Sequence, residues 1–108
     1  MTAFTLDALE RIVSERAEAD PSVSYTRQLL DQGVAKCAKK LGEEGVETAL
    51  AVVAGERETV VMEAADLVYH LMVALESRGI KINEVLEELS RRTARSGLAE
   101  KAARPGEG

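Results

Sequence analysis

Two pairs of acidic residues lie in the middle of the chain, and within each pair the carboxylates are three residues apart. The pairs are Glu44 with Glu47 and Glu63 with Asp66. On a helix, this spacing places both side chains of a pair on one face, one turn apart. The intervening segment is apolar except near Gly55, which favours two helices joined by a turn. The two pairs could therefore face each other across an antiparallel helix pair.

Mutual repulsion among these acids determines the chemistry that the pattern predicts. Several carboxylates in a partly buried groove are unfavourable unless positive charge compensates them. Divalent cations provide this charge, and Mg²⁺ prefers carboxylate oxygen and commonly shares its ligands with substrate phosphates. The pattern therefore predicts a Mg²⁺ site formed by Glu44, Glu47, Glu63 and Asp66.

Two other interpretations of the acids remain open. They form a solvated face that pairs with nearby lysine and arginine side chains, or they hold a carboxylate-bridged iron pair. The iron interpretation is disfavoured because the Glu-x-x-His motif of such bundles is absent. The single histidine, His70, follows Asp66 on the same helical face, and it is either structural or a partner of a metal ligand.

The composition, rich in Ala, Leu, Glu, Val and Arg, predicts an all-α fold, a helical bundle built on two long antiparallel helices. We expect Thr5 to cap the first helix, Gly55 and Gly79 to end the two long helices, and Asn83 to cap the last one. The helices are expected over residues 5–19, 24–30, 34–54, 56–78 and 83–97, with one more turn over 98–104. Residues 1–104 are expected to form a single domain, and 105–108 a disordered tail.

The helix expected over residues 56–78 is apolar on most of its circumference, which is typical of a helix buried on most sides. A chain of 108 residues can hardly bury such a helix alone. We therefore expect the bundle to be completed by oligomerisation, as a homodimer or a higher homo-oligomer.

Charge and hydropathy limit the partners and the compartment. The net charge of −5 argues against a general nucleic-acid surface. The longest apolar stretch, residues 49–54, is too short to cross a bilayer, and residues 1–20 do not have the pattern of a signal peptide. We expect a cytoplasmic protein whose single cysteine, Cys37, is a small core residue.

The pattern Glu43-Glu44-x-x-Glu47 followed by Glu63-x-x-Asp66 resembles the motif of the MazG-like superfamily, the all-α nucleoside-triphosphate pyrophosphohydrolases. That motif specifies only the superfamily. Further segments of the chain are similar to the phosphoribosyl-ATP pyrophosphohydrolase family within it, namely residues 24–26, 39–44, 66–70 and 96–104.

This resemblance implies Mg²⁺-dependent hydrolysis of 1-(5-phosphoribosyl)-ATP to 1-(5-phosphoribosyl)-AMP and pyrophosphate, a step of histidine biosynthesis. Water would attack the α-phosphorus, activated by the metal or by a carboxylate. The expected catalytic residues are Glu43, Glu44 and Glu47, with Glu43 orienting the water or supporting the metal ligands. The expected phosphate contacts are Lys40, Arg95, Lys101 and Arg104.

Two alternatives to this function also remain open. The first is a housecleaning pyrophosphohydrolase for ordinary or damaged nucleotides, which would share the metal site but not the substrate. The second is a helical dimerisation module without enzymatic activity, whose acids are only surface residues.

Overall fold

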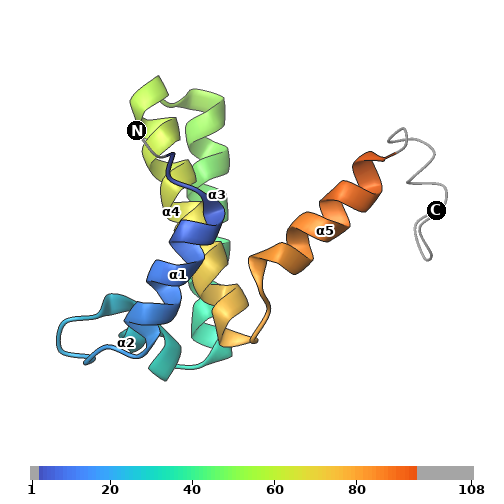
Figure 1. Cartoon of the computed structure of the whole chain (residues 1–108). Coiled ribbons are helices and arrows are strands. Elements are labelled where there is room, and N and C mark those ends of the chain that lie inside the picture. The colour runs from blue at the N-terminus through green and yellow to red at the C-terminus, as the bar shows by residue number, and fades with distance from the viewer. Residues whose placement is uncertain (1–2, 95–108) are drawn as a thin grey trace.

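The computed structural model describes residues 3–94, and within that range it is all helical, with no strand (Figure 1). The prediction of an all-α fold is confirmed. The helices are α1 (Leu6–Ala17), α2 (Tyr25–Asp31), α3 (Val34–Ala54), α4 (Arg57–Ser77) and α5 (Ile82–Thr93). The further helical turn expected over 98–104 and the tail expected over 105–108 lie outside the described residues.

α3 and α4 are the two longest of these helices, each with 21 residues, and they lie side by side in opposite directions (Figure 1). Only Gly55 and Glu56 separate them, so the chain reverses within two residues. A Cβ atom at Gly55 would lie 2.8 Å from the carbonyl oxygen of Ala51, which explains why glycine occupies this position. α1 packs against α2 and α4, whereas α5 extends away from the helix pair (Figure 1).

Local capping signals account for several of the helix ends. Thr5 Oγ1 accepts a hydrogen bond from the Ala8 amide at 3.1 Å and begins α1 as predicted. Ser24, where the second helix is expected to begin, caps α2 in the same way. Gly79 ends α4 with φ +67°, and the amide of Ile80 returns to the Leu75 carbonyl oxygen at 3.0 Å. These features form a Schellman motif, in which glycine is favoured because the backbone is left-handed.

The predicted cap of α5 is wrong. Lys81, not Asn83, is the N-cap residue, and Asn83 lies inside the helix with its side-chain amide bonded to Glu87 at 2.9 Å. The amide of Ile82 instead donates to Glu10 Oε2 of α1 at 2.6 Å. A carboxylate supplied by a distant helix satisfies this amide, which has no partner within the helix, and complements the helix dipole, so a local asparagine cap is not needed.

The buried core is small and lies where α1 and α2 meet α3 and α4. Its fully buried members are Val13, Leu29, Cys37, Met72, Val73 and Ile82. The expectation that Cys37 is a small core residue is confirmed, and its thiol donates to the Leu29 carbonyl oxygen at 3.5 Å.

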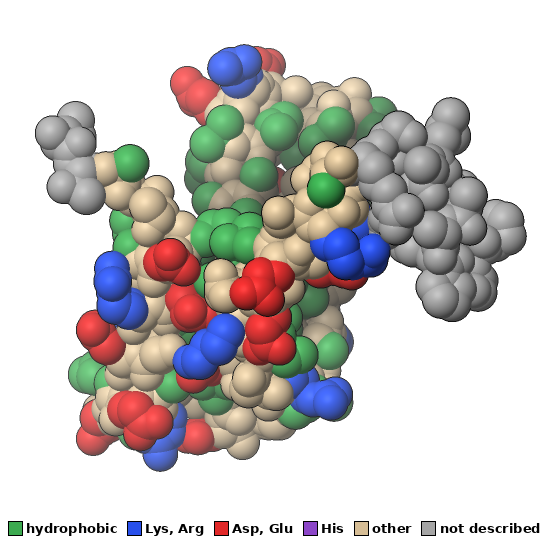
Figure 2. All heavy atoms as spheres, turned by 45° about the vertical axis from the view of Figure 1, so that its right-hand side comes forward, with side chains coloured by type: hydrophobic (Ala, Val, Ile, Leu, Met, Phe, Trp, Pro, Cys, Tyr) green, Lys and Arg blue, Asp and Glu red, His purple; other side chains and the backbone are tan. Residues whose placement is uncertain are grey.

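Large apolar side chains remain exposed on the half of the α3–α4 pair nearest its turn. Val46, Leu50 and Val53 of α3 are 61%, 65% and 84% exposed, and Val61 and Met62 of α4 are 61% and 67% exposed. Figure 2 shows apolar side chains at the surface of the helices near this end of the molecule. The core of one chain therefore covers only part of the apolar surface that the sequence provides.

Candidate active site

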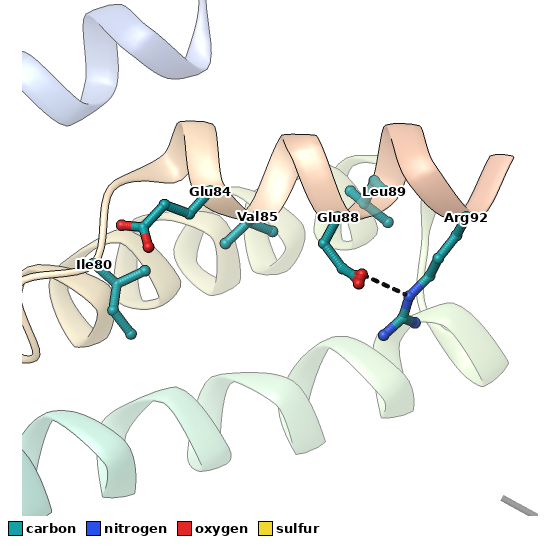
Figure 3. Close-up of a pocket in the computed structure, with 6 residues that line it drawn as sticks. All are labelled: Ile80, Glu84, Val85, Glu88, Leu89 and Arg92. Carbon is teal, nitrogen blue, oxygen red and sulfur yellow. Dashed lines mark ion pairs between the residues drawn. The ribbon is translucent and has the colours of Figure 1, made fainter. Parts of the chain in front are cut away.

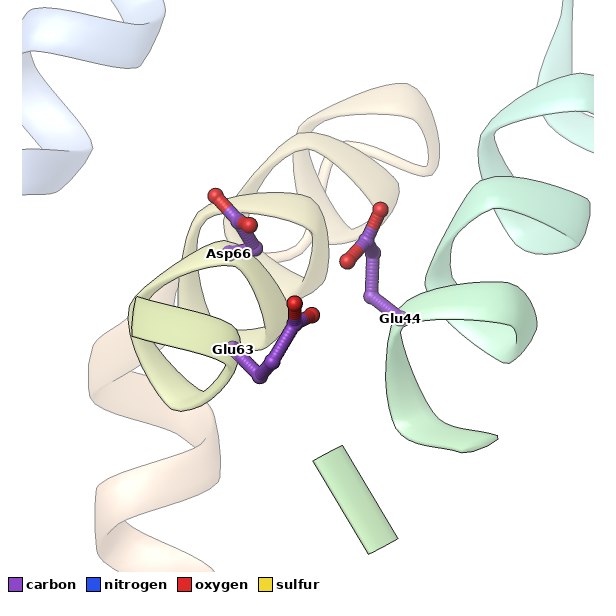
Figure 4. Close-up of side chains that lie close together, drawn as sticks. All are labelled: Glu44, Glu63 and Asp66. Atoms are coloured by element: carbon purple, nitrogen blue, oxygen red, sulfur yellow. The ribbon is translucent and has the colours of Figure 1, made fainter. Parts of the chain in front are cut away.

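Three of the four predicted metal-binding acids come together between α3 and α4. Glu44 extends from α3 and Glu63 from α4 into the space between the helices, and Asp66 lies beside them on the next turn of α4 (Figure 4). One oxygen from each carboxylate lies within 4.8 Å of the other two. The antiparallel packing of the two helices therefore produces the convergence that the sequence spacing predicts.

Thr48 fixes the register of the two helices at the level of these acids. Its hydroxyl group lies 2.7 Å from the Glu44 carbonyl oxygen, one turn earlier in α3, and 3.0 Å from the Glu63 carbonyl oxygen in α4. A side chain that reaches the backbone of both acid-bearing residues resists sliding of one helix along the other. The sequence analysis missed Thr48, although its position four residues after Glu44, on the same helical face, is a usable signal.

Burial and like charge act together on the clustered carboxylates. Burial raises the pKa of Glu44 above the ordinary value, and the neighbouring charges of Glu47, Asp66 and Glu63 raise it further. The pKa of Glu63 is raised for the same reasons, with burial first and Glu47 next. Glu44 and Glu63 are partly buried, and Asp66 is exposed. Glu47 is also exposed and lies outside the three-residue cluster, but it is close enough to act electrostatically on Glu44 and Glu63.

Two carboxylate oxygens in this cluster are buried without a hydrogen-bond partner, Glu44 Oε2 and Glu63 Oε2. Buried polar atoms are normally paired, because an unpaired one loses its bonds to water without compensation. A divalent cation compensates such oxygens directly, and oxygen-only donors suit Mg²⁺. The residues present therefore fit a hard divalent metal ion.

His70 lies beside the cluster and is only 6% exposed. Its Nε2 atom is 4.0 Å from Glu44 Oε1. Burial, together with the positive charge of Lys40, lowers the pKa of His70, while the negative charges of Asp66 and Glu43 oppose this shift. A lowered pKa keeps the imidazole neutral at pH 7.

The remaining predicted site residues are not part of the three-residue acidic cluster. Glu43 is exposed and lines a shallow hollow with Gly42, Val46 and Glu47 of α3. Lys40 is partly buried one turn before Glu44 and acts on His70 through its charge. Three predicted phosphate contacts, Arg95, Lys101 and Arg104, lie outside the described residues.

A second hollow, beside α5, carries no comparable chemistry. Ile80, Val85 and Leu89 give it a largely apolar lining (Figure 3). Both of its acids have partners: Glu84 accepts a hydrogen bond from the Lys81 amide at 2.9 Å, and Glu88 pairs with Arg92 at 3.7 Å. Glu88 also pairs with Arg91 at 2.7 Å, and these arginines lower its pKa. The acids between α3 and α4 are therefore the stronger candidate for a reactive site.

Comparison with known proteins places the chain among relatives of similar length. A phosphoribosyl-ATP pyrophosphatase of Azorhizobium caulinodans is 58% identical over 100 residues, which cover 93% of this chain and 92% of the relative. One of Methylobacterium nodulans is 59% identical over 104 residues, which cover 96% of this chain and 97% of the relative. One of Rhizobium rhizogenes is 55% identical over 104 residues, which cover 96% of this chain and the whole of the relative.

None of the helices in residues 3–94 combines the length and the apolar character required to span a membrane. The family model for phosphoribosyl-ATP pyrophosphohydrolase matches residues 6–93, which include all the described helices and the whole acidic cluster. Together with the high identity to its relatives, this match shows that the chain belongs to the phosphoribosyl-ATP pyrophosphohydrolase family.

Proposed function

We propose that this chain hydrolyses 1-(5-phosphoribosyl)-ATP to 1-(5-phosphoribosyl)-AMP and pyrophosphate, as a step of histidine biosynthesis in the cytoplasm, where a nucleoside-triphosphate substrate is available. The names of its relatives and its family support this assignment. The structural observation that carries the proposal is the convergence of Glu44, Glu63 and Asp66, with two buried oxygens that lack partners.

We assign the metal ligands to the acids of the α3–α4 pair. Glu44, Glu63 and Asp66 would hold Mg²⁺, and Glu47 would join them from its exposed position beside the cluster. When bound, Mg²⁺ would supply positive charge that offsets the negative charge developing on the pyrophosphate leaving group.

Other residues would orient the water and the phosphates. The water that attacks the α-phosphorus needs an acceptor for its proton, and Glu43 and Glu47 are both exposed on the face of α3 that adjoins the cluster. Lys40 would contact phosphate oxygens as a point charge from the preceding turn. Arg95, Lys101 and Arg104 are proposed as further phosphate contacts from the C-terminal part of the chain.

We also propose that the functional form is a homodimer or a higher homo-oligomer. The exposed apolar residues of α3 and α4 support this, because a second copy of the same helix pair would cover them and complete a helical bundle.

Glu47→Gln should lower kcat/KM for phosphoribosyl-ATP by about 100-fold or more, because it removes a proposed ligand charge while keeping the shape of the side chain. Pyrophosphate release measures this, with dCTP, dUTP and ATP assayed beside the proposed substrate. Glu15→Gln, at an exposed glutamate of α1, is the matched control and should retain activity. Unchanged turnover in Glu47→Gln would contradict the role of this acid, and faster hydrolysis of dCTP or dUTP would favour a housecleaning enzyme.

Mg²⁺ should raise the melting temperature of the wild-type protein, since a ligand that binds only the folded state stabilises it. The effect should shrink as the pH falls from 8 toward 5, because protons compete for the carboxylates whose pKa values are raised. Without metal, the stability of the folded protein should change with pH in the opposite direction. Because the carboxylate pKa values are raised in the folded state, charge repulsion lowers the stability at pH 7, and acidification relieves it.

Thermal unfolding of Glu44→Gln tests both the charge repulsion in the metal-free protein and the stabilisation by Mg²⁺. At pH 7 without metal this variant should be at least as stable as the wild type, because it removes one of the repelling charges. It should also lose most of the stabilisation by Mg²⁺. A variant that is destabilised without metal, yet stabilised by Mg²⁺ as much as the wild type, would show that Glu44 is not a ligand.

Leu50→Glu combined with Val53→Glu should shift the protein toward monomer, because two charges would have to be buried at the proposed interface. Light scattering after size-exclusion chromatography, at micromolar concentrations, reports the mass. Val23→Glu introduces the same charge at a site that is 81% exposed but outside this apolar surface, and it should leave the mass unchanged. A monomeric wild type would refute the interface.

A further inference from the structure

His70 is a buried polar residue that the proposed mechanism does not yet use. It lies on α4, one turn after Asp66, and only 6% of it is exposed. Its Nε2 atom faces Glu44 Oε1 of α3 at 4.0 Å. This separation exceeds a hydrogen bond, and the imidazole is neutral at pH 7, so the contact is between the dipole of the ring and the charge of the carboxylate. It occurs where both side chains are nearly excluded from water and screening is weak.

Two tyrosine rings hold the imidazole of His70 in place. Tyr69 packs edge-on against it with ring centroids 5.0 Å apart, and Tyr25 does so from α2 at 6.3 Å. The hydroxyl of Tyr69 is itself fixed by a 2.6 Å hydrogen bond to Thr26, which is 1% exposed. The ring is therefore restrained by contacts from two helices and has little freedom to turn away from Glu44.

Glu44 needs such a restraint more than its neighbours do. Its carboxylate faces the negative charges of Glu63 and Asp66, and repulsion favours rotation of its side chain out of the cluster. One of its oxygens, Oε2, is buried and unpaired, while the other, Oε1, faces the imidazole. His70 thus lies beside one oxygen of Glu44, while the other oxygen is left without a partner for a cation to compensate.

We propose that His70 is a positioning residue that holds the Glu44 carboxylate in the orientation required to bind a divalent cation. The inference rests on the proposed function for the identity of the cation, but its readout is metal affinity and not hydrolysis. It assigns no proton transfer to His70. Ligating carboxylates commonly depend on such neighbours, and their loss typically weakens metal binding 10–100-fold.

Two substitutions separate positioning from packing. His70→Phe keeps a ring between the tyrosines but removes the polar nitrogen, and His70→Gln places a side-chain amide near the position of Nε2. Mg²⁺ affinity of the full-length protein is measured by isothermal titration calorimetry, and the melting temperature is measured without metal. His70→Phe should raise the Kd for Mg²⁺ by roughly tenfold or more, and His70→Gln should recover most of this loss.

The melting temperatures of the His70 variants show whether a loss of Mg²⁺ affinity merely follows from a loss of stability. If His70→Phe binds Mg²⁺ within twofold of the wild type, the proposal is wrong. It is equally wrong if both variants lose affinity only in proportion to a lowered melting temperature. Should His70→Phe fail to fold, His70→Met removes the same nitrogen and takes its place under the same criteria. Val13→Ala, a core substitution in α1, controls for lost stability and should leave the Kd unchanged.

The outcome is separable from that of the proposed function. A wild type that binds Mg²⁺ but does not hydrolyse phosphoribosyl-ATP would defeat the proposed reaction, while the affinities of the His70 variants would still decide the positioning role. A wild type that binds no Mg²⁺ between micromolar and millimolar concentrations would overturn the positioning role as well.

Discussion

The repulsion among the carboxylates of Glu44, Glu63 and Asp66, of which the first two are partly buried, is the constraint on which the structure of this site depends. Folding brings Glu44, Glu63 and Asp66 together although each is better solvated apart, and burial with like charge raises the pKa of Glu44 and Glu63. Such an arrangement lowers the stability of the folded chain as long as no cation compensates the charges. The rest of the chain supplies the contacts that hold it, and a bound cation would convert the repulsion into coordination.

Those contacts come from three directions. Thr48 joins the backbones of the two acid-bearing helices, and the short turn at Gly55 keeps the helices adjacent. α1 and α2 cover the opposite end of the pair, where the small core lies and where Tyr69 is bonded to Thr26. The apolar residues of α3 and α4 near the turn are exposed in a single chain, so the stability of this half of the helix pair would gain from a second copy that buries them.

Local patterns in the sequence predict much of this, and tertiary contacts account for the rest. Thr5, Ser24 and Gly79 mark helix ends correctly because a cap depends on only a few neighbouring residues. The acid spacing predicted the convergence because helical periodicity fixes which side chains share a face. Asn83 failed as a cap because a carboxylate from α1 satisfies the start of α5. The exposed position of Glu47 likewise depends on how the two helices are rotated, which spacing alone does not determine.

The most direct test of the central claim is the position of a bound cation. Crystals soaked with Mn²⁺, a substitute for Mg²⁺ that scatters anomalously, should show an anomalous difference peak among the carboxylate oxygens of Glu44, Glu63 and Asp66, at coordination distance from each. A peak elsewhere on the surface, or carboxylates that turn apart toward solvent with no peak between them, would contradict the account.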